Sequence, residues 1–169
     1  MKWIKKAFNR TIILTDDVEK EIGSITFELF ESKVNAQLNG KKYIFDISGF
    51  IEKNVAIFDE SNTQIGNIAL GFRAKAVATL SNGEIYVWKK NDFFLRNWEL
   101  IHDLPNTDND PVILNFERTR HFFEETGSVK ILEKIDNQEL VILIGFFVGM
   151  YFIRRRRRVA GMAGIVAIA

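Results

Sequence analysis

Hydrophobic and polar residues alternate along most of the chain with the two-residue period of a half-buried β-strand. The clearest alternations lie at residues 25–29 and 75–80. Asn39-Gly40 and Asn82-Gly83 each separate two such stretches, and Asn-Gly accepts the positive φ angles that a tight type I′ hairpin needs. The pattern therefore predicts antiparallel strands joined by hairpins.

The predicted strands can be followed along the whole chain up to residue 132. They occupy residues 11–15, 21–30, 33–38, 41–47, 54–59, 64–71, 74–81, 84–89, 97–101, 112–116, 120–123 and 128–132. Residues 103–111 (DLPNTDNDP) contain both prolines, which cannot join a strand ladder, so we expect a surface loop there. The first nine residues, MKWIKKAFN, fit either a short interfacial helix or an N-terminal strand.

The chain also contains an internal repeat with a period of about 43 residues, formed by residues 12–50 and 55–94. Each copy would supply four strands. Two β-meanders of similar composition are the alternative explanation. The matched pairs are Ile22 and Ile65, Gly23 and Gly66, Ile25 and Ile68, Lys33 and Lys75, Ala36 and Ala78, Leu38 and Leu80, Asn39 and Asn82, Gly40 and Gly83, and Tyr43 and Tyr86.

Residues 140–153 (LVILIGFFVGMYFI) are uncharged and mostly apolar, and five arginines follow directly. As an α-helix this segment would be about 21 Å long, whereas a bilayer core of about 30 Å takes roughly twenty residues. A helix that is apolar on every face needs lipid or protein around it, and a barrel of about twelve strands has room for one. The sequence therefore predicts a mainly β fold. It is a closed antiparallel barrel of about twelve strands, built from the repeat, with one hydrophobic C-terminal helix that is either central or membrane-anchoring.

In these features the sequence resembles the tubby C-terminal-like superfamily, which includes the LURP-one-related proteins and the phospholipid scramblases. The likeness covers about residues 11–153. The resemblance implies a closed twelve-stranded barrel around a hydrophobic C-terminal helix, and contact with phosphoinositides or other phospholipids. The ending, RRRRR followed by VAGMAGIVAIA, departs from the family pattern and leaves the position of the helix open. The residues that carry the likeness are Ile22, Gly23, Lys33, Ala36, Gly40 and Tyr43, with Ile65, Gly66, Lys75, Ala78, Gly83 and Tyr86.

The net charge of +1 hides an uneven distribution. Removing the five arginines at 154–158 from the 23 Lys and Arg leaves 18 basic against 22 acidic residues, a net charge of −4 for residues 1–153. The body is thus mildly acidic and the tail strongly basic, which points to anionic partners for the tail. A hydrophobic content of 47% excludes a disordered chain, and the absence of cysteine excludes disulfides and cysteine-type zinc sites.

Catalytic motifs are absent from the sequence. The chain has two histidines, no Gly-x-Ser-x-Gly element, and no phosphate-binding or dinucleotide-binding glycine loop. Asp103, Asp108 and Asp110 lack the spacing of an EF-hand loop. We therefore expect no enzyme activity, no catalytic residue, no metal site and no cofactor.

The five arginines carry the candidate functional site. Five adjacent like charges must face water, phosphate or lipid headgroups, and after an apolar helix they match a positive-inside signal. Near a membrane surface each would contribute about 1 kcal/mol to binding anionic lipid. A solvated charge run is the alternative, and the acidic body argues against nucleic acid. The candidate headgroup contacts are Arg154, Arg155, Arg156, Arg157 and Arg158, with the repeat-equivalent Lys33 and Lys75.

Together these features predict a non-enzymatic, lipid-binding or membrane-associated β-barrel that contacts anionic phospholipid headgroups. We expect it at a cytoplasmic membrane face, peripheral or tail-anchored and not secreted, because no long apolar stretch begins the chain. The expected divisions are an N-terminal segment at 1–10, the barrel with its helix (about 138–153) at 11–153, and a basic and apolar tail at 154–169. The alternatives are a tail-anchored β-domain that binds a protein, and a lipid-carrier barrel with the apolar segment outside its lumen.

Overall fold

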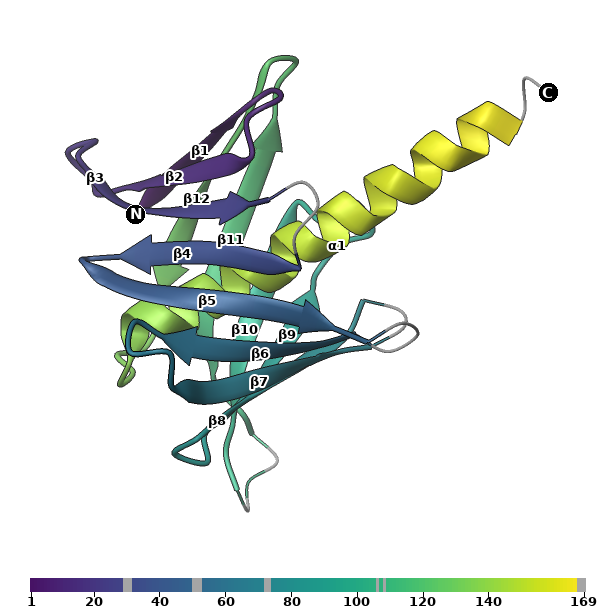
Figure 1. The fold of residues 1–169 in the computed structure, drawn as a ribbon. Coiled ribbons are helices and arrows are strands. Elements are labelled where there is room, and N and C mark those ends of the chain that lie inside the picture. Colours follow the sequence, from purple (N-terminus) through teal and green to yellow (C-terminus); the bar gives the residue numbers. More distant parts are fainter. Residues whose placement is uncertain (29–31, 50–52, 72–73, 106, 108, 167–169) are drawn as a thin grey trace.

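Twelve strands form one antiparallel sheet, and a helix follows them (Figure 1). The structure, a computed structural model, describes residues 1–28, 32–49, 53–71, 74–105, 107 and 109–166. The elements are β1 (Lys2–Lys6), β2 (Thr11–Thr15), β3 (Glu21–Phe27), β4 (Lys33–Leu38), β5 (Lys41–Ser48), β6 (Lys53–Asp59), β7 (Gln64–Leu70), β8 (Ala76–Leu80), β9 (Ile85–Lys90), β10 (Asn97–Asp103), β11 (Val112–Arg120), β12 (Glu124–Ile131) and α1 (Gln138–Val166).

The sheet closes because its first strand pairs with its last. β1 lies between β12 and β2, with Trp3 opposite Gly127 on one side and Leu14 on the other. All other neighbouring strands are also consecutive in the chain. An up-and-down barrel of this kind leaves no free strand edge. The predicted closed antiparallel barrel of about twelve strands with a C-terminal helix is thereby confirmed.

The strands differ from the prediction in two places. Residues 2–6 form β1, the N-terminal strand that was one of the two alternatives for the first nine residues, so the barrel begins before residue 11. The short strands predicted at 112–116, 120–123 and 128–132 are two longer ones, β11 and β12, joined at residues 121–123. Glu117 and Arg118 interrupt the apolar pattern, yet their backbone continues the ladder. Glu117 is exposed on the outer face, and Arg118 lies on the same face as Phe116, where the buried Glu125 pairs with it.

The two Asn-Gly turns take different forms. Asn39 and Gly40 both have positive φ angles, 51° and 82°, so the predicted type I′ turn is confirmed there. In the second pair only Gly83 has a positive φ, of 91°, and its N–H donates to the Leu80 carbonyl at 3.0 Å. The link between β8 and β9 is longer, which relaxes the demand for two left-handed residues.

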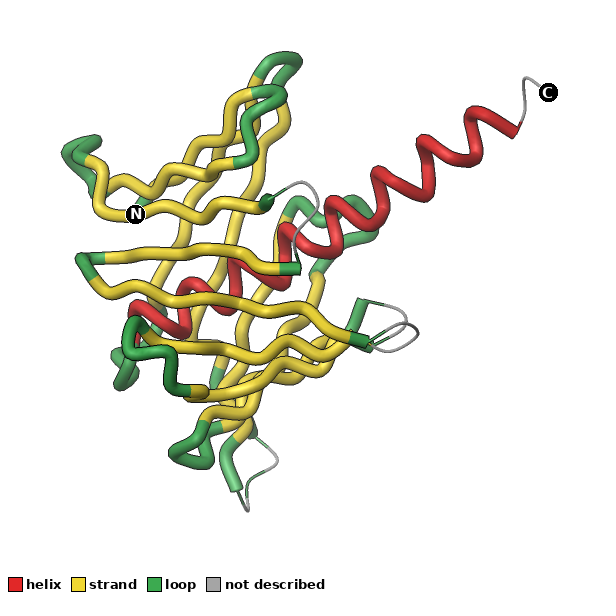
Figure 2. The backbone as a smooth tube through the Cα atoms, viewed as in Figure 1, coloured by secondary structure: helices red, strands yellow, loops and turns green. Residues whose placement is uncertain are grey.

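The first half of α1 lies inside the barrel (Figure 2). Its side chains at residues 140–153 are buried, except for the half-buried Tyr151. Trp3 and Phe116 pack edge-on against Phe146, with ring centroids 5.8 and 5.2 Å away, and strand residues lining the lumen surround the rest of the segment. The inward faces of the strands and the apolar helix therefore form one continuous core.

The helix passes closest to the barrel wall at two glycines. A Cβ atom on Gly145 would lie 2.3 Å from Cζ of Phe116, and one on Gly149 would lie 2.6 Å from Cε2 of Trp98. The Trp98 indole N–H donates to the Gly145 carbonyl at 3.1 Å. The missing side chains let two large rings of β10 and β11 rest directly on the helix backbone.

The second half of α1 projects away from the barrel, as Figure 1 shows. The helix continues to Val166, beyond the expected end at residue 153, because arginine is a good helix former and nothing in residues 154–158 breaks the helix. Within the part of the chain that the structure describes, no helix is long and apolar enough to cross a membrane.

Candidate functional site: the basic end of the barrel

The alternating strand directions bring all the predicted headgroup residues to one end of the barrel. The odd-numbered strands up to β11 end there, the even-numbered strands start there, and α1 leaves the lumen there with residues 154–158. Lys33 is the first residue of β4, and Lys75 directly precedes β8. We call this end the arginine end and the other the opposite end.

Charge divides between these two ends. The described basic residues at the arginine end are Lys5, Lys6, Arg10, Lys33, Lys53, Lys75, Lys89, Lys90, Arg96, Arg118, Arg120, Arg154, Arg155, Arg156, Arg157 and Arg158, against the acidic Glu28, Asp46, Asp92, Glu99, Glu117, Glu124 and Glu125. The described acidic residues at the opposite end are Asp16, Asp17, Glu19, Glu21, Asp59, Glu60, Glu84, Asp103, Asp110, Glu133, Asp136 and Glu139, against the basic Lys2, Lys20, Lys41, Lys42, Lys130 and Lys134. The barrel is therefore electrically polar along its axis, with the helical arginines at the end that already carries the strand cations.

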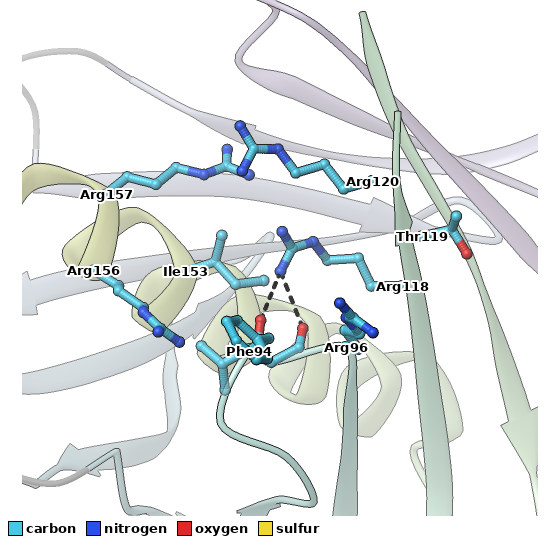
Figure 3. Close-up of a pocket in the computed structure, with 9 residues that line it drawn as sticks. Phe94, Arg96, Arg118, Thr119, Arg120, Ile153, Arg156 and Arg157 are labelled. Carbon is cyan, nitrogen blue, oxygen red and sulfur yellow. Dashed lines mark hydrogen bonds between the residues drawn. The ribbon is translucent and has the colours of Figure 1, made fainter. Parts of the chain in front are cut away.

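A cavity of about 590 Å³ opens at the arginine end, between α1 and the ends of β10 and β11 (Figure 3). Its walls contain five arginines together with apolar groups such as Ile153. In Figure 3 the guanidinium groups of Arg120 and Arg157 point toward one another. The five arginines are Arg96, Arg118, Arg120, Arg156 and Arg157.

Glu125 holds two of these arginines in place. It is the one buried charged residue in the described part of the chain. Nε of Arg118 donates to its carboxylate at 3.1 Å, and the guanidinium of Arg157 donates to the same carboxylate. One carboxylate balances one of the five guanidinium charges in the cavity, so the cavity retains an excess of positive charge.

Burial, and after it neighbouring cations, lowers the pKa of two arginines at this end. Burial lowers the pKa of Arg154, and the charges of Arg158, Arg10 and Arg157 lower it further. Burial also lowers the pKa of Arg118. These directions mean that positive groups are crowded and partly desolvated here, a condition that a bound anion would relieve.

Only some of the headgroup residues predicted from the sequence line this cavity. Arg156 and Arg157 line the cavity, and Arg156 also lies over the Phe93 ring, 4.1 Å from its centroid. Arg154 lies over the Phe27 ring at 4.6 Å. Arg155 and Arg158 are exposed, and so are Lys33 and Lys75, which share the arginine end without lining the cavity.

Three cavity residues were missed by the sequence analysis: Arg96, Arg118 and Arg120. Arg96 directly precedes β10, whereas Arg118 and Arg120 lie two residues apart on β11, and none of the three stands in a run of basic residues. The strand order could have revealed them. In an up-and-down barrel every second link lies at the same end, so the β9–β10 and β11–β12 links lie at one end of the barrel. The incorrect break of β11 near residue 117 hid this arrangement.

Comparison with protein-family models, curated proteins and solved structures finds no match to this chain. The function must therefore be argued from the site itself.

Replacing Glu125 by Gln is expected to lower the free energy of unfolding by about 2 kcal/mol, because two arginines lose their buried anionic partner. Chemical denaturation of the variant measures this. Glu124→Gln at the neighbouring, half-buried position is the matched control and should change stability by less than about 0.5 kcal/mol. Equal effects at the two positions would contradict a structural role for the Glu125 pairs.

Proposed function

We propose that this protein is a non-enzymatic membrane-associated barrel, whose arginine end contacts the headgroups of anionic phospholipids. The observation that carries the proposal is the charge division along the barrel axis. Sixteen described basic residues gather at the end where α1 emerges, while acidic residues dominate the opposite end. In the field of an anionic surface, such a molecule is oriented with its arginine end toward the lipid.

The form of the basic surface favours a lipid surface over nucleic acid. The cations surround one end of a barrel instead of following a groove, and the acidic opposite end would be repelled by an extended polyanion. The arginine cavity adds a place where a phosphate group could be held by several guanidinium groups at once. The second half of α1 emerges from the same end, with the uncharged sequence VAGMAGIV at residues 159–166.

The two alternatives differ in what supports them. A lipid-carrier barrel needs an open lumen with the apolar segment outside, whereas residues 140–153 are buried among the inward-facing strand residues. A protein-binding β-domain remains compatible with a charged end, because an acidic protein surface would attract the same cations. No specific contact among the described residues favours either alternative over the lipid proposal.

We further infer that β2–β5 and β6–β9 are two copies of one ancestral unit, as the sequence repeat predicts. Asp16 and Asp59, 43 positions apart, occupy the same place in their hairpins. Each carboxylate accepts hydrogen bonds from the backbone N–H groups two and four residues ahead. Gly23 and Gly66 both lie tight against the following strand. These parallels also support the proposed kinship with the tubby-like barrels.

The experiment that tests the proposal replaces Arg155, Arg156 and Arg158 by Gln and measures binding to vesicles of phosphatidylcholine and phosphatidylserine by co-sedimentation. These three arginines lie outside the Glu125 ion pairs. At about 1 kcal/mol per charge, we expect binding to weaken roughly a hundredfold at low salt. Vesicles of phosphatidylcholine alone should bind both proteins equally weakly.

The matched control changes the same net charge at the other end of the barrel. Lys20, Lys42 and Lys134 are exposed at the opposite end, and their replacement by Gln should leave vesicle binding unchanged within about twofold. If the two triple variants lose affinity equally, net charge and not the arginine end attracts the vesicle, and the proposal fails. If neither loses affinity, headgroup contact by these arginines is excluded.

A further inference from the structure

We propose that exposed phenylalanine side chains at the hairpin tips of the arginine end insert into the interface of an anionic lipid bilayer. They are Phe8, Phe93, Phe94, Phe122 and Phe123. This inference rests on the proposed function and adds the apolar half of the same contact. The arginines hold headgroup phosphates, and the rings reach past them toward the acyl chains.

The exposure of these rings is extensive and confined to one end. It ranges from 61% for Phe94 to 102% for Phe8, and the β1–β2, β9–β10 and β11–β12 links carry them. All the exposed aromatic residues in the described part of the chain lie at this end. Solvent-exposed rings of this size are costly in water, and a group of them marks an interaction surface.

The sequence extends the same pattern around the barrel. The three remaining links at the arginine end contain Phe30, Phe50 and Phe72, which lie outside the described residues. By contrast, the links that follow β2, β4, β6, β8, β10 and β12 at the opposite end contain no Phe, Tyr or Trp in the sequence. In the described links, the five rings at the arginine end are exposed, so packing of the core does not account for them.

The described tips are held in place by their own hydrogen bonds. The backbone N–H of Ala7 donates to the Phe123 carbonyl at 2.6 Å, which joins the β1–β2 tip to the β11–β12 tip. In the β9–β10 link, the Asp92 carboxylate accepts from the backbone N–H groups of Phe94 and Arg96, at 2.7 and 2.9 Å. Preordered tips lose little conformational entropy when they enter a lipid surface.

Phe8 has a backbone conformation that is unfavourable for phenylalanine. Its φ angle is +64°, in the left-handed region where glycine and asparagine are favoured and a bulky aromatic residue is strained. The ring is fully exposed, so packing of the side chain does not compensate for this strain, and only the backbone hydrogen bonds of the turn hold it. A strained residue without a role in the fold points to a role outside it.

The cations are interleaved with the rings. Arg156 lies 4.1 Å from the ring centroid of Phe93, and Arg96 lies 5.4 Å from that of Phe94. Arg120 lines both the arginine cavity and a smaller pocket formed with Phe122 and its neighbours. Basic groups next to apolar rings are the arrangement by which interfacial proteins bind anionic bilayers.

The separation of the tips favours a bilayer over a protein partner. The rings come from three hairpins and form two groups, because Phe8 shares a pocket with Phe122 and Phe123 while Phe93 packs edge-on against Phe94, and a protein would need a matched surface for each group. A fluid lipid interface accepts separate tips without such matching. We therefore assign the surface to lipid, with the acidic lipid headgroups complementary to the surrounding arginines and lysines.

The test compares the wild-type chain with a tip variant, Phe8→Asn, Phe93→Ser and Phe122→Ser, which keeps every charge. Binding to phosphatidylcholine–phosphatidylserine vesicles is measured by co-sedimentation at about 0.1 M and about 1 M salt, where the Debye length falls from about 10 Å to about 3 Å. The wild type should retain salt-resistant binding. The tip variant should bind roughly a hundredfold more weakly at low salt and lose the salt-resistant part.

A matched control removes apolar surface from the other end. Val18 and Leu132 are exposed there, and their replacement by Ser should leave binding unchanged. The Arg155, Arg156 and Arg158 variant separates the two proposals. If only the tip variant weakens binding, the headgroup function fails and ring insertion stands. If only the arginine variant does, ring insertion is overturned, and a protein partner becomes the expected ligand of the rings.

A spectroscopic measurement tests insertion directly. The three native tryptophans are buried, at 2%, 2% and 0% exposure, so the emission of a Phe122→Trp variant reports the new residue when vesicles are added. We expect a blue shift with phosphatidylserine vesicles, and quenching by lipids brominated on the acyl chain. The control Val18→Trp should show neither. An unshifted emission from the vesicle-bound Phe122→Trp variant would overturn the inference.

Discussion

A chain that ends at residue 136 is expected to lose the folded barrel altogether. The eleven large apolar side chains that α1 buries between Leu140 and Ile153 would be absent. At about 2 kcal/mol for each, their burial contributes roughly 20 kcal/mol, which exceeds the 5–15 kcal/mol net stability of a typical domain. The inward faces of the strands would also be exposed to water. Circular dichroism and thermal unfolding should show no cooperative transition for this variant.

The matched control is a chain that ends at residue 158. It keeps the whole buried part of α1 and the arginines, and lacks only the part of the helix that projects from the barrel. We expect its melting temperature to stay close to that of the wild type. If residues 1–136 alone unfold cooperatively at the wild-type temperature, the helix is not part of the core and the burial of residues 140–153 is incidental.

The strands could be predicted where their outer face is polar and their inner face apolar. β4 is an example, because Val34, Ala36 and Leu38 point inward and the residues between them are exposed. β1 could not be assigned with the same certainty. Its five residues fit a helix as well as a strand, and only closure of the barrel against β12 selects the strand.

The candidate site could be predicted only in part, because closure of the barrel brings together residues that lie far apart in the sequence. The run at residues 154–158 is evident in the sequence, whereas Arg96 precedes β10 and Arg118 and Arg120 lie on β11, more than twenty positions further along the chain. A single phenylalanine in a link likewise carries no periodicity. Its recurrence in every second link becomes visible only when the strand order assigns those links to one end.

Replacing Gly145 and Gly149 together by Ala is expected to lower the free energy of unfolding by about 4 kcal/mol. Helix propensity alone predicts the opposite sign, a gain of about 1 kcal/mol at each position. The steric cost of packing outweighs this gain, because the new Cβ atoms would lie 2.3 Å from Phe116 and 2.6 Å from Trp98. Overpacking of a filled core costs about 1–3 kcal/mol at each site, and more where the neighbours cannot move.

The two rings have little freedom to give way. Trp98 and Phe116 stack on each other with centroids 5.4 Å apart, both are fully buried, and the Trp98 indole is tied to the Gly145 carbonyl. The control is Gly161→Ala, in the part of α1 that projects from the barrel, where helix propensity predicts that stability should not fall. Adding Phe116→Leu to Gly145→Ala should recover part of the loss, since it makes room for the methyl group. Denaturant titration of these variants measures the coupling, and additive losses would mean that the two residues do not compete for the same space.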